Sequence, residues 1–385
     1  MDNWPLAQLR SLKDRRLLRS LNSSIRPIGD GKVCIDDKVF IDFSSNDYLG
    51  LSHHPSLKKA ARNAIKKYGL GARASRLMSG NVELYLDLER LLSDLKSTEA
   101  SLVFGSGYLC NLAIISSILG PGDCAILDRL CHASIVDGAL LSRSRIKRFQ
   151  HNDMDHLLKI LEKSQKKYKK IMVAVESVYS MDGDLCPIEK LLNIVTDFDA
   201  LLIVDEAHAI GVFGEQGEGL IARASIPKPD IVIGTFGKAL GGYGAFCCCS
   251  EELKDYFINK ARGLIYSTGL PPSVLASDLE ALRLLPQLEQ ERTKLLSAAS
   301  DLRYFIRDEL GLETRGNSQI VPLLIGDVQR TMELERHLFS HGILAKAIRP
   351  PTVPEGSARI RFSLSAFHGK DILSKLKEAL LRFFK

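Results

Sequence analysis

Two apolar runs of strand length, each ending abruptly in polar side chains, constrain the fold of this chain more than any other feature. One run ends at Asp205 and is followed three residues later by His208. The other ends at Thr235 and is followed three residues later by Lys238, in a glycine-rich segment. Runs of this length and composition are typical of buried strands. In a sheet of parallel strands, polar groups that follow the strands gather at one edge, so the two runs predict a shared site.

Strands and helices alternate through the middle of the chain. The expected strands are residues 100–104, 124–127, 170–176, 201–205, 231–235 and 244–249. Helices are expected at 107–119, 132–141 and 188–198. This alternation predicts an α/β fold, with a mainly parallel sheet that helices cover on both faces.

Further elements lie on either side of this region. The sequence predicts an amphipathic helix at 9–21, a hairpin at 33–43, helices at 55–68 and 83–95, and a long helical stretch at 272–308. Strands at 320–325 and 358–363 then alternate with helices at 332–341 and 370–384, which indicates a smaller C-terminal α/β unit. With 385 residues the chain is long enough for one large and one small domain. We place the segments at 1–45, 46–285 and 286–385.

Composition and charge exclude several classes of protein. The net charge of +6 is modest for this length and does not require a nucleic-acid partner. Two basic tracts, 143–148 and 163–170, contain few aromatic residues, so exposed surface is their simpler interpretation. The apolar stretch at 109–119 is too short to span a bilayer, and the N-terminus lacks the apolar core of a signal peptide. We therefore expect no membrane contact and a cytoplasmic location.

The eight cysteines form no CxxC pair, which argues against zinc and leads us to expect no metal. Three of them are consecutive, at 247–249, in a run that is typical of a buried strand. Buried free thiols in a reducing compartment are the simpler interpretation.

A glycine-containing turn between an expected strand and helix offers a place for a phosphate. Ser106, Gly107 and Tyr108 stand where the first free N–H groups of that helix face outward, and such groups bind anions. Most turns of this kind bind nothing, and Tyr108 is equally explained by packing in the core.

Three residues near strand ends suit a charged aromatic ring. A carboxylate at Asp205 would be costly to bury unless a partner such as a pyridinium N–H compensated it. His208 lies on the turn that follows, where it can bond a phenolic oxygen. His132 lies at a strand-to-helix turn, where an imidazole can stack on the ring. A salt bridge at Asp205 and a helix cap at His132 are the ordinary alternatives.

Lys238 has the features of a lysine that forms a Schiff base. Its neighbours are small and apolar, and burial of an ammonium group lowers its pKa toward the range needed for Schiff-base formation and proton transfer. Thr235 and Ser180 follow other buried strands, where their hydroxyls can reach the same ligand. Together with Asp205, these groups indicate pyridoxal 5′-phosphate (PLP) as the cofactor.

Several segments carry a resemblance to a known family: FSSNDYLGL (43–51), SMDGD (180–184), VDEAH (204–208), TFGK (235–238) and ARIRFS (358–363). On these segments the chain resembles, over nearly its whole length, the α-oxoamine synthases, which are PLP enzymes of the aspartate-aminotransferase (type I) fold. The segments at 47–55 and 348–354 resemble the branch that joins L-alanine to a pimeloyl thioester in biotin synthesis. The resemblance implies a PLP-dependent acyltransferase that acts as a homodimer.

The resemblance implies a role for each matching residue. Lys238 would hold PLP, Asp205 would bind its ring nitrogen and His208 its ring oxygen, and His132 would stack on the ring. Lys238, Asp205 and His132 would be the catalytic groups. The remaining cofactor contacts would be Gly107, Tyr108, Ser180, Thr235 and, from the neighbouring subunit, Ser267 and Thr268. The substrate contacts would be Arg361, as the clamp for the amino-acid carboxylate, with His132, Asn46, Thr352 and Arg19.

Other functions remain open at this point. A glycine-using α-oxoamine synthase, such as a 2-amino-3-oxobutyrate CoA ligase, has the same groups. A non-catalytic subunit of this fold would lack the lysine, and a Rossmann nucleotide site would need a third glycine that the turn at 105–110 lacks. The loop at 71–76 and Tyr85 depart from the family pattern, at positions that affect the fit of the acyl substrate. Either coenzyme A or an acyl carrier protein suits the role of acyl carrier.

Overall fold

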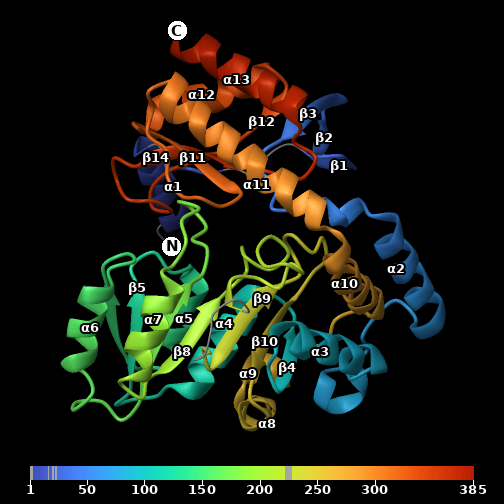
Figure 1. Ribbon diagram of the computed structural model, residues 1–385, viewed down its shortest axis with the longest axis vertical. Helices are drawn as coiled ribbons and strands as arrows, with labels where there is room; N and C mark the ends of the chain where they lie inside the picture. Colours follow the sequence, from blue (N-terminus) through green and yellow to red (C-terminus); the bar gives the residue numbers. More distant parts are fainter. Residues whose placement is uncertain (1–2, 16, 20, 22–23, 222–227) are drawn as a thin grey trace.

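The computed structural model describes residues 3–15, 17–19, 21, 24–221 and 228–385, and these form a seven-stranded sheet with two smaller sheets beside it (Figure 1). The strands of the large sheet are β4 (Ala100–Phe104), β5 (Cys124–Asp128), β6 (Arg145–Phe149), β7 (Ile171–Glu176), β8 (Leu201–Asp205), β9 (Ile231–Thr235) and β10 (Ala245–Cys249). They lie in the order β4-β10-β9-β8-β7-β5-β6. Strand β10 is antiparallel to both its neighbours, while β5 to β9 run parallel to one another.

Helices cover both faces of this sheet. Side chains alternate between the two faces along each strand, so each strand places apolar side chains against helices on both sides. Ile203 of β8 packs with the helices of one face, and Leu202 and Val204 pack with those of the other. The helices of the first face are α4 (Gly107–Ile118), α5 (Ala133–Leu141), α8 (Glu251–Lys260) and α9 (Arg262–Ile265). Those of the second face are α3 (Glu83–Lys96), α6 (Met154–Glu162), α7 (Ile188–Thr196) and α10 (Pro272–Leu284).

The C-terminal part forms a second α/β unit, which lies above the large sheet in Figure 1. Its antiparallel sheet has the order β11-β14-β13, with β11 at Ile320–Gly326, β14 at Ala358–Ser363 and β13 at Ala347–Ile348. The helices of this unit are α11 (Glu289–Tyr304), α12 (Val328–Ser340) and α13 (Lys370–Phe384).

The N-terminal strands join this second unit rather than the large sheet. Strands β1 (Ile25–Gly29), β2 (Lys32–Ile35) and β3 (Lys38–Asp42) form an antiparallel sheet, and β12 (Ile343–Leu344) adds to it in parallel beside β3. Helix α1 (Trp4–Asp14) precedes these strands, and α2 (Pro55–Tyr68) packs against α10.

The predicted α/β class, with a mainly parallel sheet and a smaller C-terminal unit, is confirmed. The helix expected at 9–21 is wrong in its placement: α1 is Trp4–Asp14, residues 17–19 and 21 lie outside any helix, and residues 16 and 20 are not among those described. The basic tract at 143–148 contains most of strand β6, where the sequence predicts only exposed surface. The three segments 1–45, 46–285 and 286–385 stay a prediction.

Among the described residues, no helix combines the length and apolarity that crossing a bilayer requires. Nor do the described His, Cys, Asp and Glu side chains gather in any group that could hold a metal ion. All eight cysteines are free thiols, and seven of them are buried.

Candidate active site

Three polar side chains stand at the carboxyl ends of three adjacent strands of the large sheet. Glu176 ends β7, Asp205 ends β8 and Thr235 ends β9. The register pairs Glu176 with Asp205, and Asp205 with Ile233 of β9. All three side chains are buried, with at most 8% of each residue exposed. The predicted meeting of polar groups at one sheet edge is therefore present.

A continuous chain of hydrogen bonds starts at the amine of Lys238. Its Nζ lies 2.7 Å from Nε2 of His208, and Nδ1 of His208 lies 2.7 Å from the hydroxyl of Tyr48. That hydroxyl donates to Oδ1 of Asn46 at 3.1 Å. When Nε2 accepts from the lysine, Nδ1 of His208 carries the proton and donates to Tyr48. Each hydrogen bond of this chain then has one donor and one acceptor.

The guanidinium group of Arg361 completes the chain. Both of its terminal nitrogens donate to Oδ1 of Asn46, at 3.2 and 3.3 Å, and Nη2 lies 3.4 Å from the Tyr48 hydroxyl. Its Nε donates to the backbone carbonyl of Ser180 at 2.6 Å, and Nη1 donates to the hydroxyl of Ser363 at 2.7 Å. Because Arg361 lies on β14, these bonds run from the large sheet to the C-terminal unit, and they join five of the predicted site residues: Lys238, His208, Asn46, Ser180 and Arg361.

Burial sets the electrostatics of this group. It lowers the pKa of Lys238 to about 8, although the carboxylates of Asp205 and Glu176 oppose the shift. Burial, followed by the charges of Lys238 and Arg361, also holds the pKa of His208 well below its usual value. His208 is therefore neutral, and the lysine amine approaches its neutral form near pH 8. A neutral amine in such a position is both a nucleophile and a base.

A second chain of hydrogen bonds joins Asp205 to His132. Asn111 donates from Nδ2 to Oδ2 of Asp205 at 2.8 Å and to the hydroxyl of Ser134 at 3.0 Å. That hydroxyl lies 2.8 Å from Nδ1 of His132, which also accepts from the Ser134 N–H at 3.2 Å and so caps α5. The other oxygen of Asp205 accepts from the Ala207 N–H at 2.9 Å. The partners of the Asp205 carboxylate are thus neutral amides.

Glu176 is a member of the site that the sequence pattern does not single out. Only 3% of the residue is exposed, its carboxyl accepts a hydrogen bond from the backbone of His132, and Oε1 has no partner within the described chain. Burial, reinforced by Asp205 and opposed by Lys238, raises the pKa of Glu176 to about 8. Glu176 therefore holds a proton at neutral pH. Its position at the end of an expected strand is the only signal in the sequence.

Tyr48, Asn111 and Gln319 are further members that the sequence analysis missed. Gln319 is fully buried, and its Nε2 donates to the backbone carbonyl of His208 at 2.8 Å. Each of these three residues has a site partner at least 94 positions away in the chain: His208 for Tyr48 and for Gln319, and Asp205 for Asn111. Local pattern carries no record of contacts over such separations.

The start of α4 has the features predicted for a phosphate site. Gly107 is its first residue, and Ser106 caps it by accepting from the Leu109 N–H at 3.2 Å. The N–H groups of a first helical turn have no partner within the helix. A Cβ atom on Gly107 would meet no atom within 4 Å, so the approach to these groups is open. Tyr108 is 47% exposed and bonds through its hydroxyl to Asp137.

Thr235 and Thr268 have other contacts in the structure. The Thr235 hydroxyl donates to the carbonyl of Gly244 at 2.7 Å and accepts from the Gly237 N–H at 3.2 Å, so it holds its own loop. Thr268 is exposed and forms an isolated antiparallel bridge with Ser75.

Arg19 and Thr352 contact each other. Nη2 of Arg19 donates to the hydroxyl of Thr352 at 2.8 Å, and both residues are exposed. Close by, Nη2 of Arg349 donates to the backbone carbonyl of Leu18 at 2.7 Å. Two predicted substrate contacts therefore form a pair between the N-terminal segment and the C-terminal unit.

Residues 38–380 match the family model of aminotransferases of class I and II. The chain belongs to the aminotransferase class I and II family. Relatives within it include an 8-amino-7-oxononanoate synthase of Geotalea daltonii, which is 42% identical over 97% of this chain and 95% of its own. Another, from Geobacter sulfurreducens, is 42% identical over 98% of this chain and 97% of its own. The family predicted from the sequence motifs is confirmed.

Solved structures share the fold of this aminotransferase-family chain. A serine palmitoyltransferase of Sphingomonas wittichii superposes with a TM-score of 0.92 at 29% identity, covering 98% of this chain and 96% of its own. An 8-amino-7-oxononanoate synthase of Francisella tularensis superposes with a TM-score of 0.78 at 30% identity, covering 89% of this chain and 96% of its own. A variant of the serine palmitoyltransferase of S. paucimobilis was solved with a bound PLP–myriocin aldimine; it has a TM-score of 0.91 at 28% identity and covers 99% of this chain and 96% of its own. The predicted fold type and the PLP cofactor are confirmed.

Proposed function

We propose that this chain is a PLP-dependent acyltransferase that joins L-alanine to a pimeloyl thioester, a step of biotin synthesis. The products are 8-amino-7-oxononanoate, CO₂ and the free thiol: one carbon–carbon bond forms, while the thioester C–S bond and the carboxyl C–C bond of alanine break. The curated relatives with 42% identity are named for this reaction. The observation that carries the proposal is the hydrogen-bonded chain from Lys238 to Arg361, because it sets an amine base and a guanidinium group in one site.

The donor set at the sheet edge suits PLP. The free N–H groups of α4 and the open space at Gly107 suit a phosphate. The carboxylate of Asp205 has neutral partners, so its charge is available for a pyridinium N–H. Lys238 is the amine for the aldehyde carbon, with His208 beside it for the ring oxygen and His132 for the ring face. When bound, PLP supplies an electron sink that stabilises a carbanion at the amino-acid Cα.

The side chains of the chain itself then divide the work. Arg361 binds the alanine carboxylate, because its own partners are neutral oxygens and a guanidinium fork matches a carboxylate. Lys238 accepts the Cα proton at Nζ once the amine is neutral, and its bond to Nε2 of His208 fixes where that nitrogen lies.

The proposal extends to a homodimer in the cytoplasm, with coenzyme A or an acyl carrier protein as the carrier of the pimeloyl group. Thr268 is exposed, and its neighbour Tyr266 is 71% exposed. Such an aromatic and polar surface suits contact with a second copy. Light scattering of the purified protein tests the homodimer.

The reaction is tested with purified protein, PLP, L-alanine and either pimeloyl-CoA or a pimeloyl-acyl carrier protein. Mass spectrometry should detect 8-amino-7-oxononanoate, and the two kcat/KM values identify the carrier. Glycine with acetyl-CoA tests the glycine-using alternative in the same assay. A protein that binds PLP but makes no 8-amino-7-oxononanoate from either pimeloyl thioester contradicts the proposal.

A further inference from the structure

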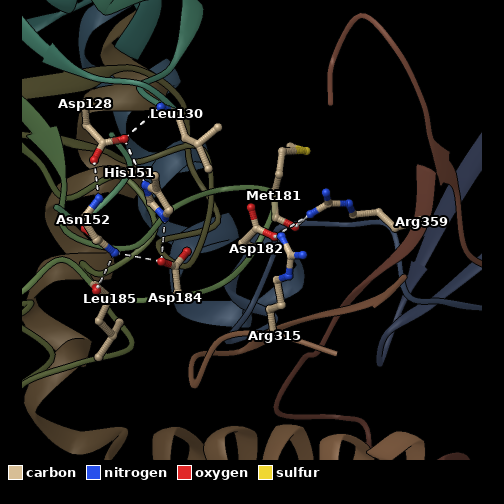
Figure 2. A network of polar contacts seen from close by, with 10 residues as sticks. All are labelled: Asp128, Leu130, His151, Asn152, Met181, Asp182, Asp184, Leu185, Arg315 and Arg359. Atoms are coloured by element: carbon tan, nitrogen blue, oxygen red, sulfur yellow. Dashed lines mark hydrogen bonds and ion pairs between the residues drawn. The ribbon is translucent and has the colours of Figure 1, made fainter. Parts of the chain in front are cut away.

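A histidine outside the site ties together two loops that carry site residues (Figure 2). His151, just beyond β6, lies between two carboxylates: its Nδ1 is 2.9 Å from Oδ1 of Asp128, and its Nε2 is 2.7 Å from Oδ2 of Asp184. Asp128 ends β5 and opens the loop that leads to His132. Asp184 ends the segment that begins at Ser180. One imidazole ring therefore bridges both loops.

Asn152 doubles this bridge. Its backbone N–H donates to Oδ2 of Asp128 at 2.9 Å, and its Nδ2 donates to Oδ2 of Asp184 at 2.8 Å. Asp128 also accepts from the N–H of Leu130 at 2.8 Å, which fixes the turn two residues before His132. We call His151, Asn152, Asp128 and Asp184 the histidine clamp.

The histidine clamp combines a positively charged imidazole with two carboxylates. Asp128 has a fully buried side chain, and a quarter of the His151 side chain is exposed. Burial alone would lower the pKa of His151, but its hydrogen bonds to Asp128 and Asp184 outweigh this effect and raise the pKa to about 10. The edge of the ring packs on Tyr179 at 4.3 Å between centroids. The imidazolium is therefore held in one orientation, with both N–H groups donating to carboxylates.

The same loop is also held from the C-terminal unit. Asp182 accepts from Nη1 of Arg359 at 2.6 Å, and Arg315 approaches the same oxygen at 3.5 Å (Figure 2). Two residues after Arg359 on β14, Nε of Arg361 donates to the carbonyl of Ser180. The segment that begins at Ser180 is thus held by Arg359 and Arg361 of the C-terminal unit and by the histidine clamp of the large-sheet unit.

We propose that His151 is a positioning residue, which sets the Ser180 carbonyl against Arg361 and the His132 loop against the sheet edge, and so determines how tightly the amino-acid substrate binds. This inference rests on the proposed function in one respect: it takes the ligand of Arg361 to be the carboxylate of L-alanine. His151 itself touches neither substrate nor cofactor.

The test measures alanine affinity in the PLP-loaded protein, from the change in cofactor absorbance on adding L-alanine without any acyl donor. His151→Gln removes the charge and one of the two carboxylate bonds, and should weaken alanine binding by about 10-fold, the factor that corresponds to one charge-assisted hydrogen bond. Asp184→Asn replaces the charge-assisted bond at the other end of the clamp with a neutral one and should have a similar effect. Both substitutions disrupt the same contact, between His151 and Asp184. The double variant should therefore bind alanine no more weakly than the more affected single variant.

His341→Gln is the matched control, since His341 is an exposed histidine at the end of α12 and should leave alanine affinity unchanged. Thermal unfolding followed by circular dichroism ensures that each variant is assayed in its folded state. Wild-type affinity for alanine in folded His151→Gln overturns the inference, and so do single effects that multiply in the double variant. The proposed function fails separately, when wild-type protein binds alanine but forms no 8-amino-7-oxononanoate.

Discussion

Lys238 is the residue on which the chemistry depends most directly. Its amine is buried, has a neutral imidazole as its partner, and has a pKa lowered to about 8. Lys238→Ala should retain PLP by non-covalent contacts while losing about 10²–10⁴-fold or more in turnover, the range associated with loss of an acid–base group. Absorbance of the bound cofactor and steady-state kcat measure the two effects. Lys190→Ala, at an exposed lysine, should match wild type; substantial turnover in Lys238→Ala would remove this lysine from its assigned role.

The raised pKa of His151 in the histidine clamp predicts how the stability of the fold depends on pH. The folded pKa of about 10 exceeds the ordinary value of 6.5, so the folded state binds more protons between these two values. The stabilisation from His151 is therefore complete below about pH 6.5 and is lost as pH rises toward 10. Urea unfolding at several pH values should show the difference between wild type and His151→Gln shrinking across this window. A difference that stays constant with pH contradicts the assigned charge.

At the residue scale, the sequence identifies side chains whose position in an element is itself informative. Asp205 and Lys238 follow apolar runs, and the fold brings them to one edge as predicted. Tyr48 and Gln319 are not identified, because their roles arise from contacts with His208 across 160 and 111 positions. Such residues resemble ordinary core until the chain is folded.

At the scale of the element, the packing of β9 predicts that adding one methyl group at Gly234 lowers stability. Gly234 lies one residue before Thr235, and a Cβ atom there would stand 2.2 Å from Cζ of Phe246, a buried ring on the neighbouring strand. Gly234→Ala should reduce the free energy of unfolding by about 1–3 kcal/mol, because the ring has to move within a packed core. Gly71→Ala is the control, since a Cβ there meets nothing within 4 Å. Urea unfolding compares the two variants, and equal stability argues against tight packing at this strand.

Elements were predictable where their apolar pattern was strong. Strands β4, β8 and β9 and helices α2 and α13 have the predicted bounds. Strand β6 was missed because its basic residues obscure the apolar pattern of a strand. It lies at the edge of the large sheet, where charged side chains are common. Helix α1 was misplaced because it buries no residue, so no core contact fixed its apolar face. Prediction thus succeeded where burial had shaped the sequence.

At the scale of the whole molecule, the site exists only when the two units meet. Lys238 and Asp205 come from the large sheet, Arg361 comes from β14, and Tyr48 and Asn46 come from the segment that follows β3. No local sequence pattern encodes that assembly. The resemblance to a family supplied it for Arg361, but not for Tyr48.

The buried pair between Asp182 and Arg359 is the contact that most directly tests how the two units depend on each other. The side chain of Arg359 is 2% exposed and that of Asp182 is 7% exposed. Asp182→Ala would leave a buried guanidinium group without its carboxylate, which typically costs about 3–5 kcal/mol of unfolding free energy. Glu378→Ala breaks the exposed pair with Arg382 in α13 and should cost less than about 1 kcal/mol. Denaturant unfolding of both variants measures the contrast, and a loss of under about 1 kcal/mol in Asp182→Ala would mean that this ion pair contributes little to holding the two units together.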